Sequence, residues 1–503
     1  MKNQSYRNPV FYVSVCVISL LVILGAFLPK RFREIAQTLF NFTTINFGWL
    51  YLLAVFAFII FLLALSISKY GKIRLGPQNS KPEYPFFTWI GMLFSAGFGS
   101  GLVFWGVAEP MSHFFSTPFP DLVGKSEEAA RIAMGYSFFH WGISQWSVFA
   151  VVGLIIAYNQ FKKEKNGLIS TAIKPVVGGH KIVRNTIDSL AVIATVMGVA
   201  TSLGLGILQM TGGLSSTFGI PNTTWIQLII ATVMLALYLL SSSTGLNKGI
   251  KWLSNLNLGL ALLVLLFVFF AGPTVFILNS FVLGLGDYLT NFIEYSLRLT
   301  PYRGGSWVRD WTIFYWAWAI AWSPFVGAFV ARVSRGRTIR EFIFGVLVVP
   351  PAIACLWIAA FGGTALYSDL INGTGIAEAV NKDVAVALFE TFGVMPLKTI
   401  MSILSILLIF TFLVTSADSA TYILSSMTSK GSLNPVLIVK IIWGILITAI
   451  AVVLLLAGGL DALQTASLIS ALPFTIILVL IVIAFIKLLK DTELAKKDGK
   501  ELK

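Results

Sequence analysis

The sequence predicts an all-α polytopic membrane protein with twelve transmembrane helices. The chain has 503 residues, of which 57% are hydrophobic and only 12% are charged, and its mean hydropathy is +0.85. Apolar runs of about 18 residues or more recur along its whole length, which excludes a soluble globule. The expected spans are 10–28, 47–67, 86–107, 133–157, 188–212, 224–241, 252–271, 310–331, 341–362, 399–426, 435–457 and 463–487.

Basic residues predict the orientation. Lys and Arg are in excess in the termini and in the loops that share their side of the membrane, so we expect both termini to be cytoplasmic and the cell membrane to be the location. The first span ends in Leu28-Pro29-Lys30 without a small-residue cleavage pattern, so we expect it to be retained. The net charge of +14 follows from this topology and from attraction to anionic lipids in the bilayer, without a nucleic-acid partner.

The third span, 86–107, contains an unusual run of glycines. Gly97, Gly99 and Gly101 precede Glu109 in an apolar segment, and each glycine costs a helix about 1 kcal/mol relative to alanine. One interpretation is an interrupted helix whose backbone carbonyls face an ion or a small solute. The alternative is close packing of a neighbouring helix, because Gly97 and Gly101 have the required spacing of four.

The fourth and eighth spans are rich in aromatic residues. Span 4 contains His140, Trp141, Trp146 and Phe149, and span 8 contains Trp311, Tyr315, Trp316, Trp318 and Trp322. We expect Trp311 and Tyr315 to belong to an interfacial belt. Trp318 and Trp322 lie deeper and one helical turn apart, which suits a cage for a cation without hydrogen-bond donors. Ordinary packing of an aromatic stripe is the alternative.

Span 10 supplies oxygen atoms in an aliphatic setting. Thr415, Ser416 and Asp418 lie in this span, and an intramembrane carboxylate indicates function by default. Hard oxygen ligands favour an alkali or alkaline-earth cation over a transition metal. The sequence has three His and no readable nucleophile–base pair, P-loop or dinucleotide fingerprint, so we expect neither catalytic residues nor a catalytic metal, and the protein is not predicted to be an enzyme.

Four segments together resemble the betaine/carnitine/choline transporter (BCCT) family. They are GMLFSAGFGSGLVFWGVAEP (91–110), FFHWGISQW (138–146), DWTIFYWAWAIAWSPFVGAFVARVSRGRTIREF (310–342) and FLVTSADS (412–419). The resemblance implies a leucine-transporter-like core of two inverted five-helix repeats, each opening with an interrupted helix, at Gly97–Gly101 and at Trp322-Ser323-Pro324. It also implies a possible homotrimer.

The resemblance divides the chain into six parts. They are a cytoplasmic arm (1–9), two peripheral spans (10–85), repeat 1 with spans 3–7 (86–271), an outer amphipathic connection (272–309), repeat 2 with spans 8–12 (310–487) and a cytoplasmic tail (488–503).

The resemblance also assigns site residues. Trp141, Trp146, Phe149 and position 319 would surround the solute ammonium, with Trp318 and Trp322 along the pathway and the amides near Gly97, Gly99 and Gly101 facing a carboxylate. The carbonyls of Ser95, Phe98 and Phe412 and the hydroxyls of Thr415 and Ser416 would bind sodium. A second sodium site would need Thr195, Phe325 and a hydroxyl at position 199, which is Val199 here.

Two departures from the family pattern affect the solute. Ala319 replaces a usual Trp, and Phe149 replaces a common Tyr. Gly101 stands where choline-type members tend to carry an acid, which favours a zwitterion. We therefore expect a sodium-coupled symporter that imports a quaternary ammonium osmolyte, glycine betaine first, by alternating access, with no cofactor besides the coupling ion.

Other functions stay open at this point. One alternative is a proton-coupled or sodium-independent carrier or exchanger of choline, carnitine or a related zwitterion, in which Asp418 or Glu109 titrates. A channel or a non-transporting sensor with a transporter fold is another.

Overall fold

The computed structural model describes residues 7–97, 99–244 and 247–497, and this part of the chain is almost entirely helical. It contains ten helices that are long and apolar enough to cross a membrane. The all-α polytopic fold class is confirmed, and the protein is a multi-pass membrane protein. The pairing of the two halves as inverted repeats, with the boundaries given above, stays a prediction.

The difference between twelve predicted spans and ten long helices has two causes. The third span is divided into α3 (Phe86–Gly97) and α4 (Ser100–Phe115), each too short to cross alone. The last two spans are joined in α18 (Leu437–Lys497), which bends at Gly459. Gly459 has a φ of 61°, a backbone conformation that favours glycine. The predicted segments are therefore present, but they are connected differently.

The remaining helices follow the predicted order. They are α1 (Pro9–Phe27), α2 (Pro29–Ile67), η1 (Lys69–Lys72), α5 (Glu127–Trp141), α6 (Ile143–Ala157), η2 (Tyr158–Lys162), α7 (Ile169–Val177), α8 (Lys181–Phe218), α9 (Thr224–Thr244), α10 (Asn247–Ala271), α11 (Thr274–Thr290), α12 (Phe292–Leu297), η3 (Arg309–Ile313), α13 (Phe314–Val333), α14 (Ile339–Asn372), α15 (Ile376–Lys382), η4 (Val384–Val386), α16 (Ala387–Gly393) and α17 (Lys398–Met427).

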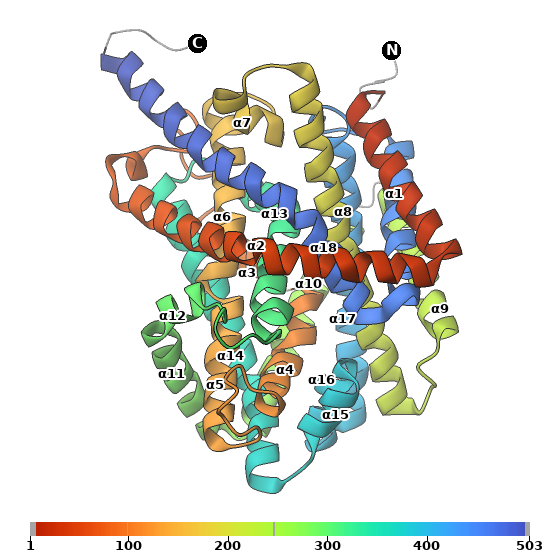
Figure 1. Cartoon of the computed structure of the whole chain (residues 1–503). Helices are drawn as coiled ribbons and strands as arrows, with labels where there is room; N and C mark the ends of the chain where they lie inside the picture. Colours follow the sequence, from red (N-terminus) through yellow and green to blue (C-terminus); the bar gives the residue numbers. More distant parts are fainter. Residues whose placement is uncertain (1–6, 98, 245–246, 498–503) are drawn as a thin grey trace.

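Helix α13 lies in the middle of the bundle, where it packs against α6, α8 and α18 (Figure 1). Helix α2 crosses the bundle at a steep angle to most of the other helices. The start of α1 and the end of α18 lie at one end of the molecule, and α15 and α16 lie at the opposite end. The predicted outer amphipathic segment forms α11 and α12, and α11 packs against α5 and α14.

Helix α13 is continuous, so the predicted interruption at Trp322-Ser323-Pro324 is wrong. Pro324 has no N–H to donate to the carbonyl of Ile320, which would normally weaken the helix at this turn. The Ser323 hydroxyl donates to that same carbonyl at 2.8 Å. The side chain therefore replaces the missing backbone bond, and the helix passes through the proline.

The fourth span has a break that the sequence did not predict. Helix α5 ends at Trp141 and α6 begins at Ile143, with Gly142 between them at a non-helical ψ of −149°. The Ile143 N–H donates to the hydroxyl of Tyr288 on α11 at 3.0 Å. A Cβ on Gly142 would lie 2.5 Å from both the Phe138 carbonyl oxygen and the Tyr288 hydroxyl. Glycine is required here because the backbone and α11 approach so closely.

We expect Gly142→Ala to destabilise the protein by about 1–3 kcal/mol, because the added methyl group overpacks this junction. Thermal unfolding in detergent measures the effect. Gly286→Ala on α11 is the matched control, since a Cβ there meets no atom within 4 Å. An unfolding midpoint for Gly142→Ala equal to that of the control would contradict the packing argument.

Candidate functional site

Five aromatic side chains from α5, α6 and α13 form a continuous arc inside the bundle. Trp141 ends α5, Trp146 and Phe149 lie on α6, and Trp318 and Trp322 lie on α13. Ring centroids are 6.2 Å apart for Trp141 and Trp318, and 6.3 Å for Trp318 and Trp322. They are 6.2 Å apart for Trp322 and Phe149, and 5.3 Å for Phe149 and Trp146. The structure therefore brings the predicted cage residues together.

Two features of this arc bear on what it can bind. The indole N–H groups of Trp318 and Trp322 are buried and have no hydrogen-bond partner within the described ranges. Buried polar groups are normally paired, so these two indole N–H groups lack the acceptor that such donors usually have. Ala319 is also buried, and it contributes only a methyl group to this region of α13.

The glycine run faces the arc. The predicted interruption is confirmed, because α3 ends at Gly97 and α4 begins at Ser100; Phe98 lies outside the described residues. A Cβ on Gly101 would lie 2.6 Å from Cη2 of Trp318, and one on Gly99 would lie 3.7 Å from Cη2 of Trp322. The glycines thus also permit close packing, but the group that approaches at these two positions is an indole ring.

Aromatic rings continue from the arc to a hollow near the loops that precede α5 and α13. Trp307 and Trp311 stack at 6.5 Å, Trp311 and Tyr315 at 6.4 Å, and Tyr315 is 6.3 Å from Trp318. We call these rings, with Trp322, the aromatic column. Its outer end lines a cavity of about 540 Å³ bounded by residues 116–121 and 298–308. The column thus connects an open hollow to the buried arc.

The prediction of an interfacial belt is wrong for Tyr315, which is completely buried. The spacing of Tyr315 from two tryptophans could have indicated this position from the sequence. Tyr315 precedes Trp318 by three residues and Trp322 by seven, so all three side chains share one face of a helix.

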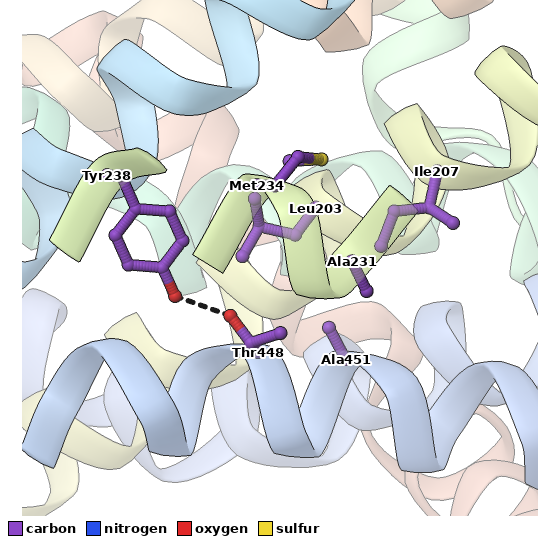
Figure 2. A pocket seen from close by; sticks show the side chains of 7 residues that line it. All are labelled: Leu203, Ile207, Ala231, Met234, Tyr238, Thr448 and Ala451. Carbon is purple, nitrogen blue, oxygen red and sulfur yellow. Dashed lines mark hydrogen bonds between the residues drawn. The ribbon is translucent and has the colours of Figure 1, made fainter. Parts of the chain in front are cut away.

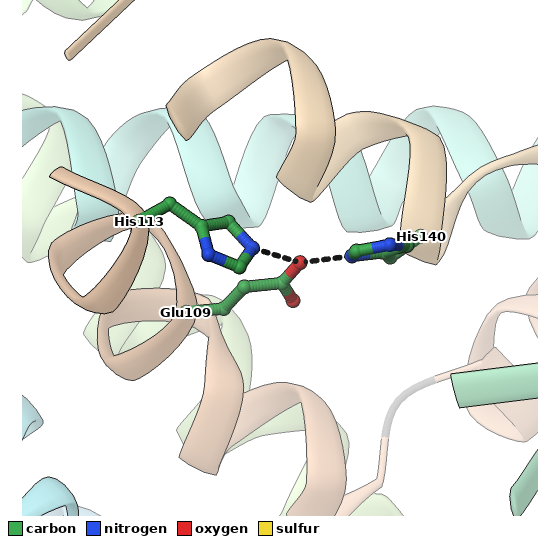
Figure 3. A group of neighbouring side chains, drawn as sticks. All are labelled: Glu109, His113 and His140. Carbon is green, nitrogen blue, oxygen red and sulfur yellow. Dashed lines mark hydrogen bonds and ion pairs between the residues drawn. The ribbon is translucent and has the colours of Figure 1, made fainter. Parts of the chain in front are cut away.

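Glu109 on α4 contacts the column through Tyr315 and is also completely buried. Figure 3 shows its carboxylate between His113 and His140. One carboxylate oxygen, Oε1, is 2.6 Å from His140 Nδ1 and 3.3 Å from His113 Nε2. The other, Oε2, accepts from Trp141 Nε1 at 2.8 Å and from the Tyr315 hydroxyl at 2.5 Å. Each oxygen of the carboxylate therefore has two partners, from α4, α5 and α13.

The same cluster has the composition of a metal site, since the possible ligand atoms of Glu109, His113 and His140 lie within 4.8 Å of one another. The separation of 2.6 Å between His140 and the carboxylate is that of a hydrogen bond, and the second His140 nitrogen is 3.0 Å from the Thr312 hydroxyl. His113 Nδ1 has no partner in the described part of the chain, but the carboxylate and both nitrogens of His140 are paired, so we interpret the cluster as a hydrogen-bond network.

The predicted sodium ligands are only partly described. The Thr415 hydroxyl lies 3.0 Å from the carbonyl oxygens of both Thr411 and Phe412, and it accepts from Asn257 Nδ2 at 3.2 Å. Ser416 is half-buried beside it. Ser95 lies in α3, and Phe98 lies outside the described residues. Helix α17, which carries three of the predicted ligands, packs against α4.

Asn257 on α10 was missed by the sequence reasoning. Its side chain is buried, and its carbonyl oxygen has no partner in the described part of the chain. An amide inside an otherwise aliphatic span is the signal that points to it.

Thr195 and Phe325, predicted for a second sodium site, contact residues of their own helices. The Thr195 hydroxyl donates to the Ala191 carbonyl at 2.7 Å. The Phe325 ring packs against Trp322 with centroids 5.6 Å apart, and Val199 is buried without a hydroxyl to offer.

A small crevice between α8, α9 and α18 lies away from this site (Figure 2). It is lined mainly by aliphatic side chains, and the Tyr238 hydroxyl bonds to Thr448 at its edge. The crevice has no space for a water molecule, so it is a packing defect and not a solute site.

A broken intramembrane helix, an adjoining aromatic arc and a connected hollow are features of membrane transporters for small solutes. The chain belongs to the betaine/carnitine/choline family of transporters, whose sequence profile matches residues 9–494. It is 71% identical to the "Ectoine/hydroxyectoine transporter" of Virgibacillus pantothenticus over 100% of both chains. It is therefore a transporter and not an enzyme.

Two further relatives are named for glycine betaine. The chain is 46% identical to the "Glycine betaine transporter OpuD" of Bacillus subtilis (strain 168), covering 94% of this chain and 93% of the relative. It is also 46% identical to the "Probable glycine betaine transporter" of Desulfitobacterium hafniense (strain Y51), covering 96% and 98%.

We expect Gly101→Ala to raise the KM of uptake at least about fivefold, equivalent to about 1 kcal/mol, because its Cβ would displace the Trp318 ring from α4. Radiolabelled solute uptake in proteoliposomes measures KM. Gly91→Ala on α3 is the control, since a Cβ there meets no atom within 4 Å. If KM were the same for both variants, the close approach of Trp318 to Gly101 would have no role in solute binding.

Proposed function

We propose that the protein is a sodium-coupled symporter that imports ectoine or hydroxyectoine by alternating access, with glycine betaine as a second solute. The observation that carries this proposal is the aromatic arc with Ala319 in place of a further indole. The identity of 71% to a protein named for ectoine and hydroxyectoine supports the choice between zwitterions.

The chemistry of ectoine suits this arc. Its protonated cyclic amidine is a flat, delocalised cation that can stack on the faces of indole rings, as a guanidinium does. Its carboxylate needs donors, and the unpaired N–H groups of Trp318 and Trp322 supply two. Glycine betaine has the same two charges, but its methylated ammonium is compact. The arc lacks the indole that the family pattern has at position 319, which leaves more room. This favours the broader amidine ring of ectoine over the compact ammonium.

Sodium coupling is supported by the neighbouring hydroxyls of Thr415 and Ser416 on α17, a helix that packs against α4. One positive charge that enters with a neutral zwitterion contributes about 2.3 kcal/mol per 100 mV of membrane potential. That is enough for roughly fifty-fold accumulation before the sodium gradient is added. A single ion therefore suffices for uptake of an osmoprotectant.

Orientation and assembly stay predictions. The excess of basic residues on one side favours cytoplasmic termini in the cell membrane and contact with anionic lipids. A homotrimer follows from the family resemblance only.

Competition uptake in proteoliposomes tests the solute and the ion together. We expect unlabelled ectoine to compete with labelled ectoine more strongly than glycine betaine does, and choline to compete least. We also expect uptake to stop when sodium is replaced by potassium. Uptake that persists without sodium and follows a proton gradient would establish the proton-coupled alternative instead.

The arc itself is tested by Trp141→Ala and Trp146→Ala. Each should raise the KM for ectoine and for glycine betaine by about tenfold or more, because a desolvated contact of a cation with an indole contributes about 2 kcal/mol. Unchanged affinity for every solute in both variants would remove the cage from the proposal.

The ion site is tested separately by Thr415→Ala combined with Ser416→Ala. We expect the sodium concentration for half-maximal uptake to rise, because two hydroxyl ligands are lost. Thr411→Ala is the matched control, since its hydroxyl bonds to the Leu407 carbonyl one turn away. The same sodium dependence in the double variant as in this control would exclude the assigned site.

A further inference from the structure

We propose that Glu109 is a positioning residue for the solute: its carboxylate fixes the Trp141 indole as one wall of the aromatic arc. This inference rests on the proposed function. Glu109 is not expected to touch the solute, because it is completely buried and its oxygens are already occupied.

Trp141 needs such an anchor because of its place in the chain. It is the last residue of α5, and the helix does not continue through Gly142. The regular helical backbone therefore holds Trp141 from its N-terminal side only. Within the described residues, the polar contact of the indole is the bond from Nε1 to Glu109 Oε2 at 2.8 Å.

The Trp141 indole lies against α4 at two points. Its N–H reaches Glu109, and its Cη2 atom lies 3.4 Å from where a Cβ on Gly101 would stand. The indole of Trp141 also makes edge-to-face contacts with Tyr315 and Trp318, with interplanar angles of 73° and 84°. With its N–H anchored, the ring presents a fixed orientation to the arc.

The charges around Glu109 show how a substitution could remove the charge of its carboxylate and still keep its hydrogen bonds. Within the described ranges, the ion pairs of Glu109 are with His113 and His140, and none is with Lys or Arg. His140 can donate from Nδ1 to the carboxylate while Nε2 accepts from the Thr312 hydroxyl, so this ring can be neutral. The carboxylate is then balanced by four hydrogen-bond donors.

Glutamine at position 109 can satisfy the same partners. Its amide oxygen can accept from Trp141 and Tyr315, and its amide N–H groups can donate to His140 Nδ1 and His113 Nε2 in their other tautomers. His140 Nε2 would then donate to Thr312. Glu109→Gln therefore keeps the anchor and removes the charge, whereas Glu109→Ala removes both.

The experiment measures KM and Vmax for ectoine, or for whichever solute the unmodified protein transports, in proteoliposomes. We expect Glu109→Ala to raise KM about tenfold or more, since a hydrogen bond to a charged group is lost. Glu109→Gln should keep KM within about threefold of the unmodified protein. In a Trp141→Phe background, which already lacks the N–H, Glu109→Ala should raise KM by less than about threefold further.

Three results would overturn the proposal. One is an equal rise in KM on Glu109→Ala in both backgrounds, because Glu109 would then act independently of Trp141. Another is a glutamine variant as impaired as the alanine variant, because charge and not anchoring would matter. The third is a change in Vmax alone. Absence of uptake by the unmodified protein is a different result, which refutes the proposed function instead.

Two controls complete the design. Glu378→Gln removes an exposed carboxylate that pairs with Lys125, and the KM of this variant should not change. Glu109→Asp retains the carboxylate on a shorter side chain and serves if Glu109→Ala does not fold, as judged by its thermal unfolding. Glu109→Asp should raise KM in the otherwise unmodified protein but not in the Trp141→Phe background. An equal rise in KM in both backgrounds would contradict anchoring.

Discussion

The arrangement of the site depends on one buried carboxylate and the hydrogen bonds it must receive. A carboxylate removed from water loses several kcal/mol of hydration unless protein donors replace it. Glu109 therefore requires donors from several directions, and they come from α4, α5 and α13. These hydrogen bonds fix the relative positions of α4, α5 and α13. Two of these helices, α5 and α13, carry residues of the aromatic arc.

Breaks in the helices are concentrated beside this network. The third span is interrupted between Gly97 and Ser100, and the fourth is interrupted at Gly142. Both breaks adjoin Trp141, which borders Gly142 and contacts Gly101. An unbroken helix would supply neither free peptide groups nor room for indole rings against its backbone. The same positions that weaken the helices thus provide free peptide groups and room for the rings.

Much of the fold could be predicted from the sequence, because apolar runs of membrane length have few other structures available. The glycine run identified the break in the third span, and the family resemblance identified the residues of the arc. The continuity of α13 could not be predicted, because it depends on the Ser323 hydroxyl replacing a single backbone bond. The kink at Gly142 depends on Tyr288, which approaches from a helix far away in the sequence. The buried position of Tyr315 depends on a carboxylate from another helix.

The aromatic column also joins two regions of different chemistry. At its outer end the hollow is bordered by charged side chains, including Arg298, Arg303, Asp121 and Asp310. Further inward the surfaces are ring faces, whose attraction depends on the shape and polarizability of what stacks on them. The two ends of the column therefore offer different interactions, which are long-range at the hollow and short-range at the arc. A substitution of an inner ring changes the stacking faces and leaves the charges around the hollow in place.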